Sequence, residues 1–186
     1  MPSSKAVLVL LLLASGAKGQ ESSPGMALQR AIEMPAHRAL ISVVEKADGI
    51  PAPFSTDGCS GGLSAGWERA AEVFPGFSRR YKAHPPWEDC CIAHDAIYHR
   101  AGGAETPEES FDKRLASDLA LQACVIDTGE QKMEVTMAET GLSEPVVRNA
   151  FLAIAGAMYN AVRLGGGPCS GLPWRWGYGF SRCFFQ

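Results

Sequence analysis

Hydrophobic residues recur at helical spacing in several stretches of this chain, and no stretch shows the apolar–polar alternation of a half-buried strand. The first helix is predicted to begin at Ser23-Pro24, because proline is well suited to the first turn of a helix. Pro35 is expected to end or kink this helix, and a second helical stretch follows at about 36–47. A third helix is predicted over about 87–101, where Gly102-Gly103 stops it.

The two longest predicted helices carry clear start signals. Thr106-Pro107-Glu108-Glu109 combines a first-turn proline with the threonine-to-glutamate spacing of a capping box, and this helix is expected to reach about Val125. Ser143-Glu144-Pro145 opens the last helix, which the glycines at 165–167 end. Its apolar face is predicted to consist of Val146, Val147, Ala150, Phe151, Ile154, Met158 and Val162. Residues 127–143 are polar and carry no clear prediction, and 49–66 is expected to be a loop.

These patterns predict a single, mainly α domain cross-linked by disulfides. The 186 residues suffice for one domain with a core, and a chain with 46% hydrophobic and 20% charged residues is neither disordered nor a polytopic membrane protein. The formal net charge of −3 argues against general nucleic-acid binding, which needs a basic surface.

Residues 1–19 have the pattern of a secretory signal peptide. Lys5 precedes an apolar run from Ala6 to Ala14, and Ala17-Lys18-Gly19 places small residues at a cleavage site. That run is far shorter than the ~20 residues needed to span a bilayer. We therefore expect a secreted domain of residues 20–186, in which 15 basic and 20 acidic side chains leave a net charge of −5.

The six cysteines agree with this compartment. An even number of cysteines in an exported chain predicts three disulfides, although six cysteines allow about 15 pairings and spacing alone does not choose among them. No CxxC motif is present, which disfavours a zinc ribbon or a thioredoxin-like site.

The segment 90–98 carries the candidate chemistry. On a helix, the adjacent Cys90 and Cys91 diverge by about 100°, so they are expected to bond to two different elements. His94 lies one turn further along this helix, and Tyr98 lies another turn beyond on the same side.

Asp118, on the next helix, is the candidate partner of this histidine. It precedes Cys124 by six residues, so a bond from Cys124 to Cys90 or Cys91 would bring Asp118 within reach of His94. A carboxylate on one imidazole nitrogen fixes the tautomer and leaves the other nitrogen as a general base.

Asp95 is expected to point toward a different neighbour. It is one helical step from His94, and Cys59 lies in the glycine-rich segment Asp57-Gly58-Cys59-Ser60-Gly61-Gly62. Glycines allow backbone carbonyls to converge on a hard cation, and Asp95 would add a carboxylate. The sequence thus predicts a histidine–aspartate pair beside an oxygen-lined calcium site.

The pattern CC-x-x-HD-x-x-Y, followed by D-x5-C, resembles the secreted phospholipases A2, and DGCSGG is similar to their calcium loop. The resemblance covers about 56–125. It implies a phospholipase A2-like fold with two antiparallel core helices, with the last helix and the aromatic tail, 144–186, as an addition.

The resemblance also implies calcium-dependent hydrolysis of the sn-2 ester of glycerophospholipids at a membrane or micelle surface. His94 would be the general base acting on water, Asp118 would orient it, and Tyr98 would be the hydroxyl partner of Asp118. The implied calcium ligands are the carboxylate of Asp95 and backbone carbonyls at Gly58, Ser60 and Gly62.

The resemblance further implies the disulfides Cys59–Cys91 and Cys90–Cys124, which leaves Cys169–Cys183 to hold the tail. One further disulfide that members of this family often carry is missing, because Ile97 and Ser117 occupy the positions of its two cysteines. A separation of about 31 residues between Cys59 and the cysteine pair is also longer than in the common secreted forms.

Three other hypotheses remain from the residues. The scaffold could be a non-catalytic lipid- or protein-binding module, or a disulfide-rich structural protein. A zinc hydrolase would use His94 and His99, but these are five residues apart instead of the four that one helix face requires. His37 and His84 are expected to be ordinary surface residues.

Several features could contact lipid. The aromatic residues Trp174, Trp176, Tyr178, Phe180, Phe184 and Phe185 would form either an interfacial patch or a tail folded onto the core. The basic residues Arg79, Arg80 and Lys82 could meet headgroups, although a solvated face is the simpler interpretation. Leu28, Ile32, Leu40 and Ile41 are expected to be core or to line an acyl channel.

Overall fold

The computed structural model describes residues 24–59 and 84–183, and regular structure within these ranges is entirely helical. The elements are α1 (Pro24–Lys46), α4 (Glu88–His99), the 3₁₀ turn η1 (Ala101–Gly103), α5 (Pro107–Gln131), α6 (Met133–Thr140) and α7 (Glu144–Gly165). The mainly α class is therefore confirmed. The segments 1–19, 67–73 and 79–82, with Phe184 and Phe185, lie outside the described residues.

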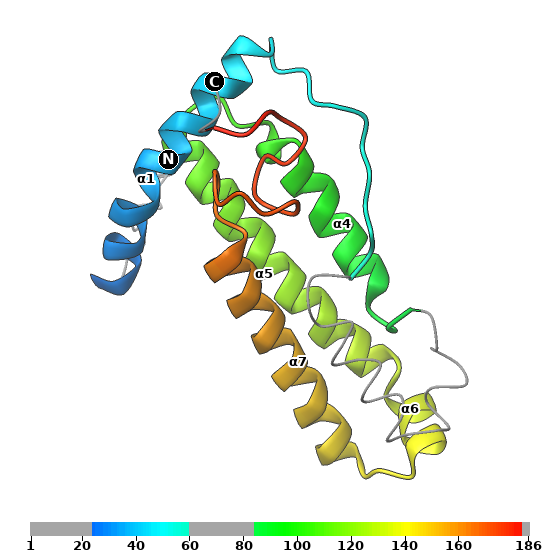
Figure 1. Ribbon diagram of the computed structural model, residues 1–186. Coiled ribbons are helices and arrows are strands. Elements are labelled where there is room, and N and C mark those ends of the chain that lie inside the picture. Colours follow the sequence, from blue (N-terminus) through cyan, green and yellow to red (C-terminus); the bar gives the residue numbers. More distant parts are fainter. Residues whose placement is uncertain (1–23, 60–83, 184–186) are drawn as a thin grey trace, which may run out of the picture.

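Helix α5 is the central element, and α1, α4 and α7 pack against it (Figure 1). Helix α4 runs antiparallel to α5, because Cys90 at its start is bonded to Cys124 whereas Tyr98 near its end contacts Asp118. Among the described helices, none is both long enough and apolar enough to cross a membrane.

The expectation that Pro35 ends the first helix, with a separate stretch at 36–47, is wrong, because α1 is one helix from Pro24 to Lys46 with Pro35 inside it. A proline inside a helix removes one backbone hydrogen bond and costs about 3 kcal/mol. Side chains on both sides of Pro35 are buried on one face of α1, namely Met34, His37, Leu40, Ile41 and Val43. Burial of this face offsets the local cost, which the sequence pattern could not weigh.

The four apolar residues of α1 divide between core and surface. Leu40 and Ile41 are buried, as expected of core residues, but Leu28 and Ile32 are 63% and 69% exposed. They are wrong as core residues. Ile32 lies about 200° around the helix from the buried Met34, and Leu28, four residues before Ile32, shares the exposed face with it.

Helix α5 begins where the capping signal predicted and ends later than predicted. The Thr106 hydroxyl accepts a hydrogen bond from the backbone N–H of Glu109, and the Glu109 carboxylate accepts one from the N–H of Glu105. The helix continues past Val125 to Gln131 because Val125 and Gly129 are buried against α7.

The aromatic tail is folded largely onto the core. Trp176 and Phe180 are buried in a cluster with Leu40 and Tyr98, and the Trp176 indole N–H donates to Ser110 Oγ at 2.9 Å. Trp174 and Tyr178 are only partly buried. The tail is thus a structural element that closes one end of the helix bundle.

The three disulfides are those that the resemblance implied. Cys59–Cys91 joins the segment before α4 to that helix, Cys90–Cys124 joins α4 to α5, and Cys169–Cys183 closes the tail. No cysteine is free. The neighbouring residues Cys90 and Cys91 therefore reach two different elements, as their helical geometry requires.

The contact between α5 and α7 predicts opposite effects for two glycine substitutions. A Cβ at Gly129 would lie 2.5 Å from Phe151 Cγ, whereas a Cβ at Gly156 meets nothing within 4 Å. We expect Gly129→Ala to lower the free energy of unfolding by ~1–3 kcal/mol through overpacking. Gly156→Ala should raise it by up to ~1 kcal/mol through helix propensity. Denaturant unfolding measures both, and equal effects would contradict the described packing.

Candidate active site

The predicted histidine–aspartate pair is formed between α4 and α5. His94 Nε2 lies 3.0 Å from Asp118 Oδ1, and both side chains are buried. Because an ionised carboxylate can only accept, Nε2 carries the hydrogen and donates it. This hydrogen bond fixes the ring tautomer and leaves Nδ1 as the basic nitrogen.

Tyr98 completes the predicted contacts of Asp118 Oδ1. The Tyr98 hydroxyl donates to Oδ1 at 2.6 Å, and its ring lies 4.1 Å from the His94 ring, centroid to centroid. Burial, with the nearby negative charge of Asp118, raises the pKa of Tyr98 well above its ordinary value. The hydroxyl therefore stays protonated and acts as a donor to Asp118.

The other carboxylate oxygen of Asp118 binds an arginine. Arg163 Nη1, from α7, donates to Asp118 Oδ2 at 2.9 Å. Arg114 lies one turn before Asp118 on α5, donates its Nε hydrogen to the Tyr98 hydroxyl at 3.3 Å, and remains 4.0 Å from Asp118 Oδ2. The orienting carboxylate is thus compensated by a cation from a third helix.

Glu33 on α1 closes this buried ionic network. Arg163 Nη2 donates to Glu33 Oε1 at 2.9 Å, and Arg114 Nη1 donates to Glu33 Oε2. Burial by itself would raise the pKa of Glu33, but its hydrogen bond with His37 and the charges of Arg114 and Arg163 lower it to about 2. Glu33 therefore remains ionised inside the bundle.

His37 corrects the expectation of a surface residue, because its side chain is fully buried. Its Nδ1 lies 2.8 Å from Ser110 Oγ and its Nε2 lies 3.5 Å from Glu33 Oε2. Burial lowers its pKa. His84 fulfils the same expectation, because its side chain is 67% exposed, although it pairs with Glu88.

Residues 56–59, in the chain before α4, lie beside Asp95. Thr56 Oγ1 donates to Asp95 Oδ2 at 2.6 Å and accepts from the N–H of Gly58 at 3.0 Å. The Cys59–Cys91 disulfide fixes this segment to α4 one turn from Asp95.

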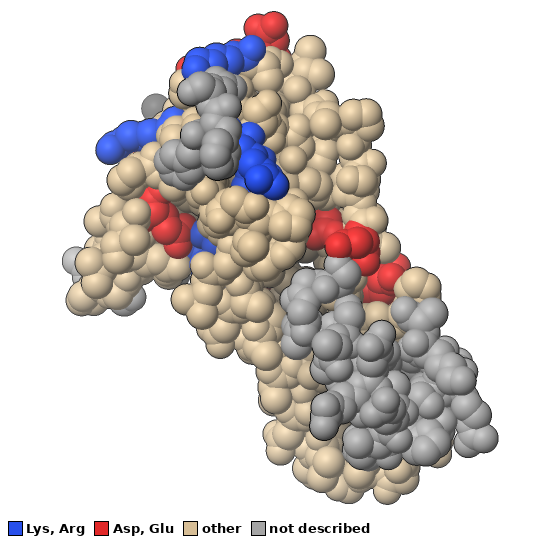
Figure 2. Space-filling model, viewed as in Figure 1, with Lys and Arg blue, Asp and Glu red and all other residues tan. Residues whose placement is uncertain are grey.

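A cavity of about 60 Å³ joins these groups. Asp57, Gly58, His94 and Asp95 form its polar side. Its apolar side is formed mainly by α7 and the tail, through Leu121, Met158, Ala161, Val162 and Trp174. Acidic side chains gather on this face of the molecule, beside α4 (Figure 2).

Two carboxylates, those of Asp57 and Asp95, line this cavity. Burial, and next the negative charge of Asp57, raise the pKa of Asp95, against the lowering effect of its hydrogen bond from Thr56. The same two charges add to burial in raising the pKa of Tyr178 to about 12. An oxygen-seeking cation between Asp57 and Asp95 would relieve this repulsion.

The donor set fits calcium by its chemistry. Two carboxylates and the Gly58 carbonyl are hard oxygen donors, which calcium prefers. In 24–59 and 84–183, no three His, Cys, Asp or Glu side chains form a metal-binding group, so backbone oxygens would have to complete the coordination. Ser60 and Gly62, the other expected ligands, lie outside the described residues.

The zinc alternative receives no support from His99. Its ring contacts the aromatic side chains of Phe54 and Tyr178 at 5.4 and 5.0 Å between ring centroids. It is buried and does not line the cavity that His94 lines. The two histidines of α4 therefore have different surroundings.

Sequence reasoning missed Asp57, Arg114, Arg163 and Glu33. Asp57 could have been found, because it adjoins the predicted ligand Gly58, and Arg114 shares a helix face with Asp118 at a spacing of four. Arg163 carried no such signal, since it is 45 residues from Asp118.

Comparison of the chain with protein-family models, with curated proteins and with solved structures finds no match. The features of this chain that point to a function are therefore the motif at 90–98 and the geometry that it forms with Asp118 and the segment before α4.

The low pKa of Glu33 predicts a specific loss of stability in acid. The group has a pKa of about 2 when folded and 4.5 ordinarily, so its contribution is fully present above about pH 4.5 and disappears as the pH falls toward 2. That contribution is on the order of 3 kcal/mol. In Glu33→Gln, the fall in unfolding free energy between these pH values should be shallower than in the parent. Equal slopes in urea titrations would contradict this assignment.

Proposed function

We propose that this protein is a secreted, calcium-dependent phospholipase A2-like hydrolase that cleaves the sn-2 ester of glycerophospholipids. The observation that carries the proposal is the His94–Asp118 hydrogen bond at a cavity that Asp95 and Gly58 also line. The motif resemblance supports the same reaction. The three disulfides and the pattern of residues 1–19 support an oxidising, extracytoplasmic compartment.

His94 would act as the general base. Its Nδ1 removes a proton from a water molecule in the cavity as the water attacks the ester carbonyl, and later returns this proton to the leaving oxygen. Asp118 stabilises the imidazolium that forms between these two steps. No covalent acyl intermediate is needed. Gly-x-Ser-x-Gly stretches occur at 58–62 and 62–66, but the described residues before them, 50–57, form no strand from which a nucleophile elbow could start.

Asp95 and Asp57 would hold the calcium ion together with the carbonyl of Gly58, and the resemblance adds carbonyls at Ser60 and Gly62. When bound, calcium would supply Lewis-acid polarisation of the ester carbonyl and stabilisation of the developing oxyanion.

The apolar wall would select an acyl substrate. Leu121 from α5 and Met158 and Val162 from α7 face the same cavity as the base. Such a wall favours a hydrocarbon chain next to the ester and excludes bulk water. The substrate would reach this cavity from a membrane or micelle surface.

The general-base role predicts a large loss of activity in His94→Gln. We expect fatty-acid release from phosphatidylcholine vesicles in millimolar calcium to fall by at least ~10²-fold, because a positioned base contributes that much to the rate. His84→Gln, an exposed histidine outside the cavity, is the matched control and should behave as the parent. Absence of release from the parent would contradict the enzymatic function and favour the non-catalytic binding module.

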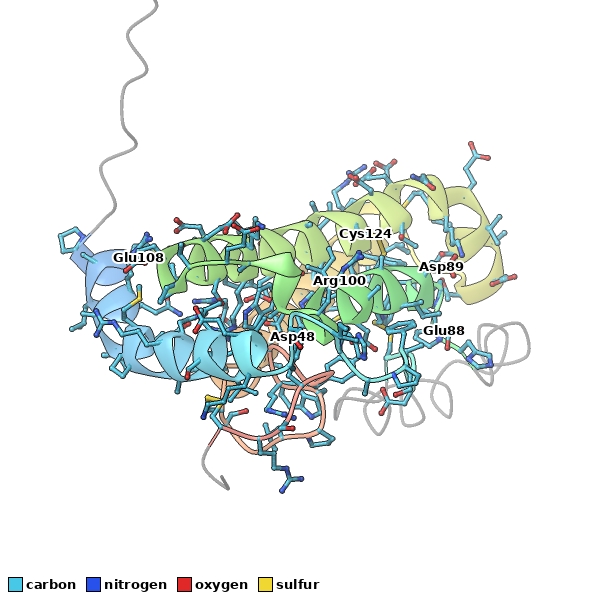
Figure 3. The ribbon with its side chains drawn as sticks, turned by 90° about the horizontal axis from the view of Figure 1, so that it is seen from above. Asp48, Glu88, Asp89, Arg100, Glu108 and Cys124 are labelled. Atoms are coloured by element: carbon cyan, nitrogen blue, oxygen red, sulfur yellow. A yellow bond between two sulfur atoms is a disulfide. The ribbon has the colours of Figure 1, made fainter. Side chains whose placement is uncertain are left out.

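The calcium role predicts a loss of metal binding in Asp95→Asn. Calcium at about a hundred times its Kd should stabilise the parent by about 2.7 kcal/mol, which appears as a rise in Tm. This rise should be lost or strongly reduced in Asp95→Asn. It should persist in Asp89→Asn, an exposed carboxylate in the first turn of the same helix (Figure 3). A calcium-induced rise of the same size in all three proteins would contradict the site.

A further inference from the structure

We propose that Arg163, near the end of α7, is a positioning residue that fixes the Asp118 carboxylate against His94. The inference rests on the function proposed above. It assigns a role in that reaction to a helix outside the motif region, because α7 begins at Glu144 whereas the motif ends near Cys124.

Three donors define the plane of the Asp118 carboxylate. Tyr98 and His94, both on α4, donate to Oδ1, and Arg163 donates to Oδ2. Without Arg163, the nearest cation to Oδ2 is Arg114 Nε at 4.0 Å, which is beyond hydrogen-bond length. The carboxylate could then rotate about its own bond and weaken the hydrogen bond to His94.

Arg163 is itself held in place from two directions. Its Nη2 donates to Glu33 Oε1, and its guanidinium lies 5.7 Å from the centre of the Phe111 ring. Arg114 fixes the backbone of the same turn, because its Nη2 donates to the carbonyls of Val162 and Arg163 at 2.8 and 2.9 Å. One planar guanidinium therefore spans two carboxylates on two different helices, which the compact ammonium of lysine could not match.

Because this ionic network is buried, its charges must balance. Asp118 and Arg114 are fully buried, and the side chains of Arg163 and Glu33 are 5% and 14% exposed. Two carboxylates and two guanidiniums have formal charges that cancel, as a desolvated cluster requires. Arg163 thus balances the negative charge of Asp118 while His94 is neutral. It also keeps the Asp118 carboxylate in one orientation when His94 takes up a proton.

The test compares Arg163→Met and Arg163→Lys with the parent by two measurements. The first is steady-state hydrolysis of phosphatidylcholine vesicles, and the second is the ¹⁵N NMR spectrum of the His94 ring, which reports its tautomer without any substrate. We expect Arg163→Met to lower kcat by ~10–100-fold, as loss of an orienting partner does, with KM close to that of the parent. Its His94 should lose the single Nε2–H tautomer. Arg163→Lys should recover part of both.

The matched control is Arg30→Met. Arg30 also joins α1 to α5, through Asp112 at 2.8 Å, and also lies over the Phe111 ring, at 4.9 Å, but its side chain is 38% exposed and its described ion pair is with Asp112 and not with Asp118. This variant should have the kcat and the ring spectrum of the parent. The comparison separates a general weakening of the α1–α5 contact from loss of the hydrogen bond between Arg163 and Asp118.

Two results would overturn the inference. One is an unchanged His94 tautomer in Arg163→Met, and the other is a kcat loss in Arg30→Met equal to that in Arg163→Met. If Arg163→Met does not fold, the Arg163→Lys ring spectrum decides, because an unaltered tautomer there removes the need for a guanidinium. If the parent releases no fatty acid, the proposed function fails, and the tautomer measurement still decides whether Arg163 positions the pair.

Discussion

The structure depends on one buried negative charge, the carboxylate of Asp118. A carboxylate without compensation inside a helix bundle would cost several kcal/mol, so every element around it supplies a donor or a cation. Helix α4 provides His94 and Tyr98, and α7 provides Arg163. The helices that form the core are therefore also the helices that orient the candidate base, and packing and chemistry cannot be separated here.

The neighbouring disulfides of α4 determine where that base faces. Cys90 ties α4 to α5 and so brings His94 to Asp118, whereas Cys91 ties α4 to Cys59 and so brings the segment before α4 beside Asp95. Two adjacent residues on one helix thus connect the candidate general base with the candidate metal-binding side of a single cavity. A small domain gains rigidity in this way at the point where its geometry matters most.

The acidic groups of the site divide into two kinds. Asp118 and Glu33 are paired with arginines, which matches the low pKa of Glu33. Asp95 and Asp57 line the cavity, and no arginine or lysine within 24–59 and 84–183 forms an ion pair with either. Burial, and next the charge of Asp57, raise the pKa of Asp95, whereas the Thr56 hydrogen bond and His94 lower it. The arginine-paired carboxylates belong to the framework of the bundle. The contrast with the two carboxylates at the cavity supports the proposal of a cation site there.

The sequence by itself determined the local features of this protein. The cap at Thr106, the divergence of Cys90 and Cys91, and the stacking of His94 and Tyr98 follow from hydrogen bonds and helical periodicity that act over a few residues. The uninterrupted α1 across Pro35, the burial of His37 and the clamp of Arg163 on Asp118 were decided by tertiary structure alone. Each depends on which helix faces meet, because burial and ion pairing join residues far apart in the chain and can override local preference.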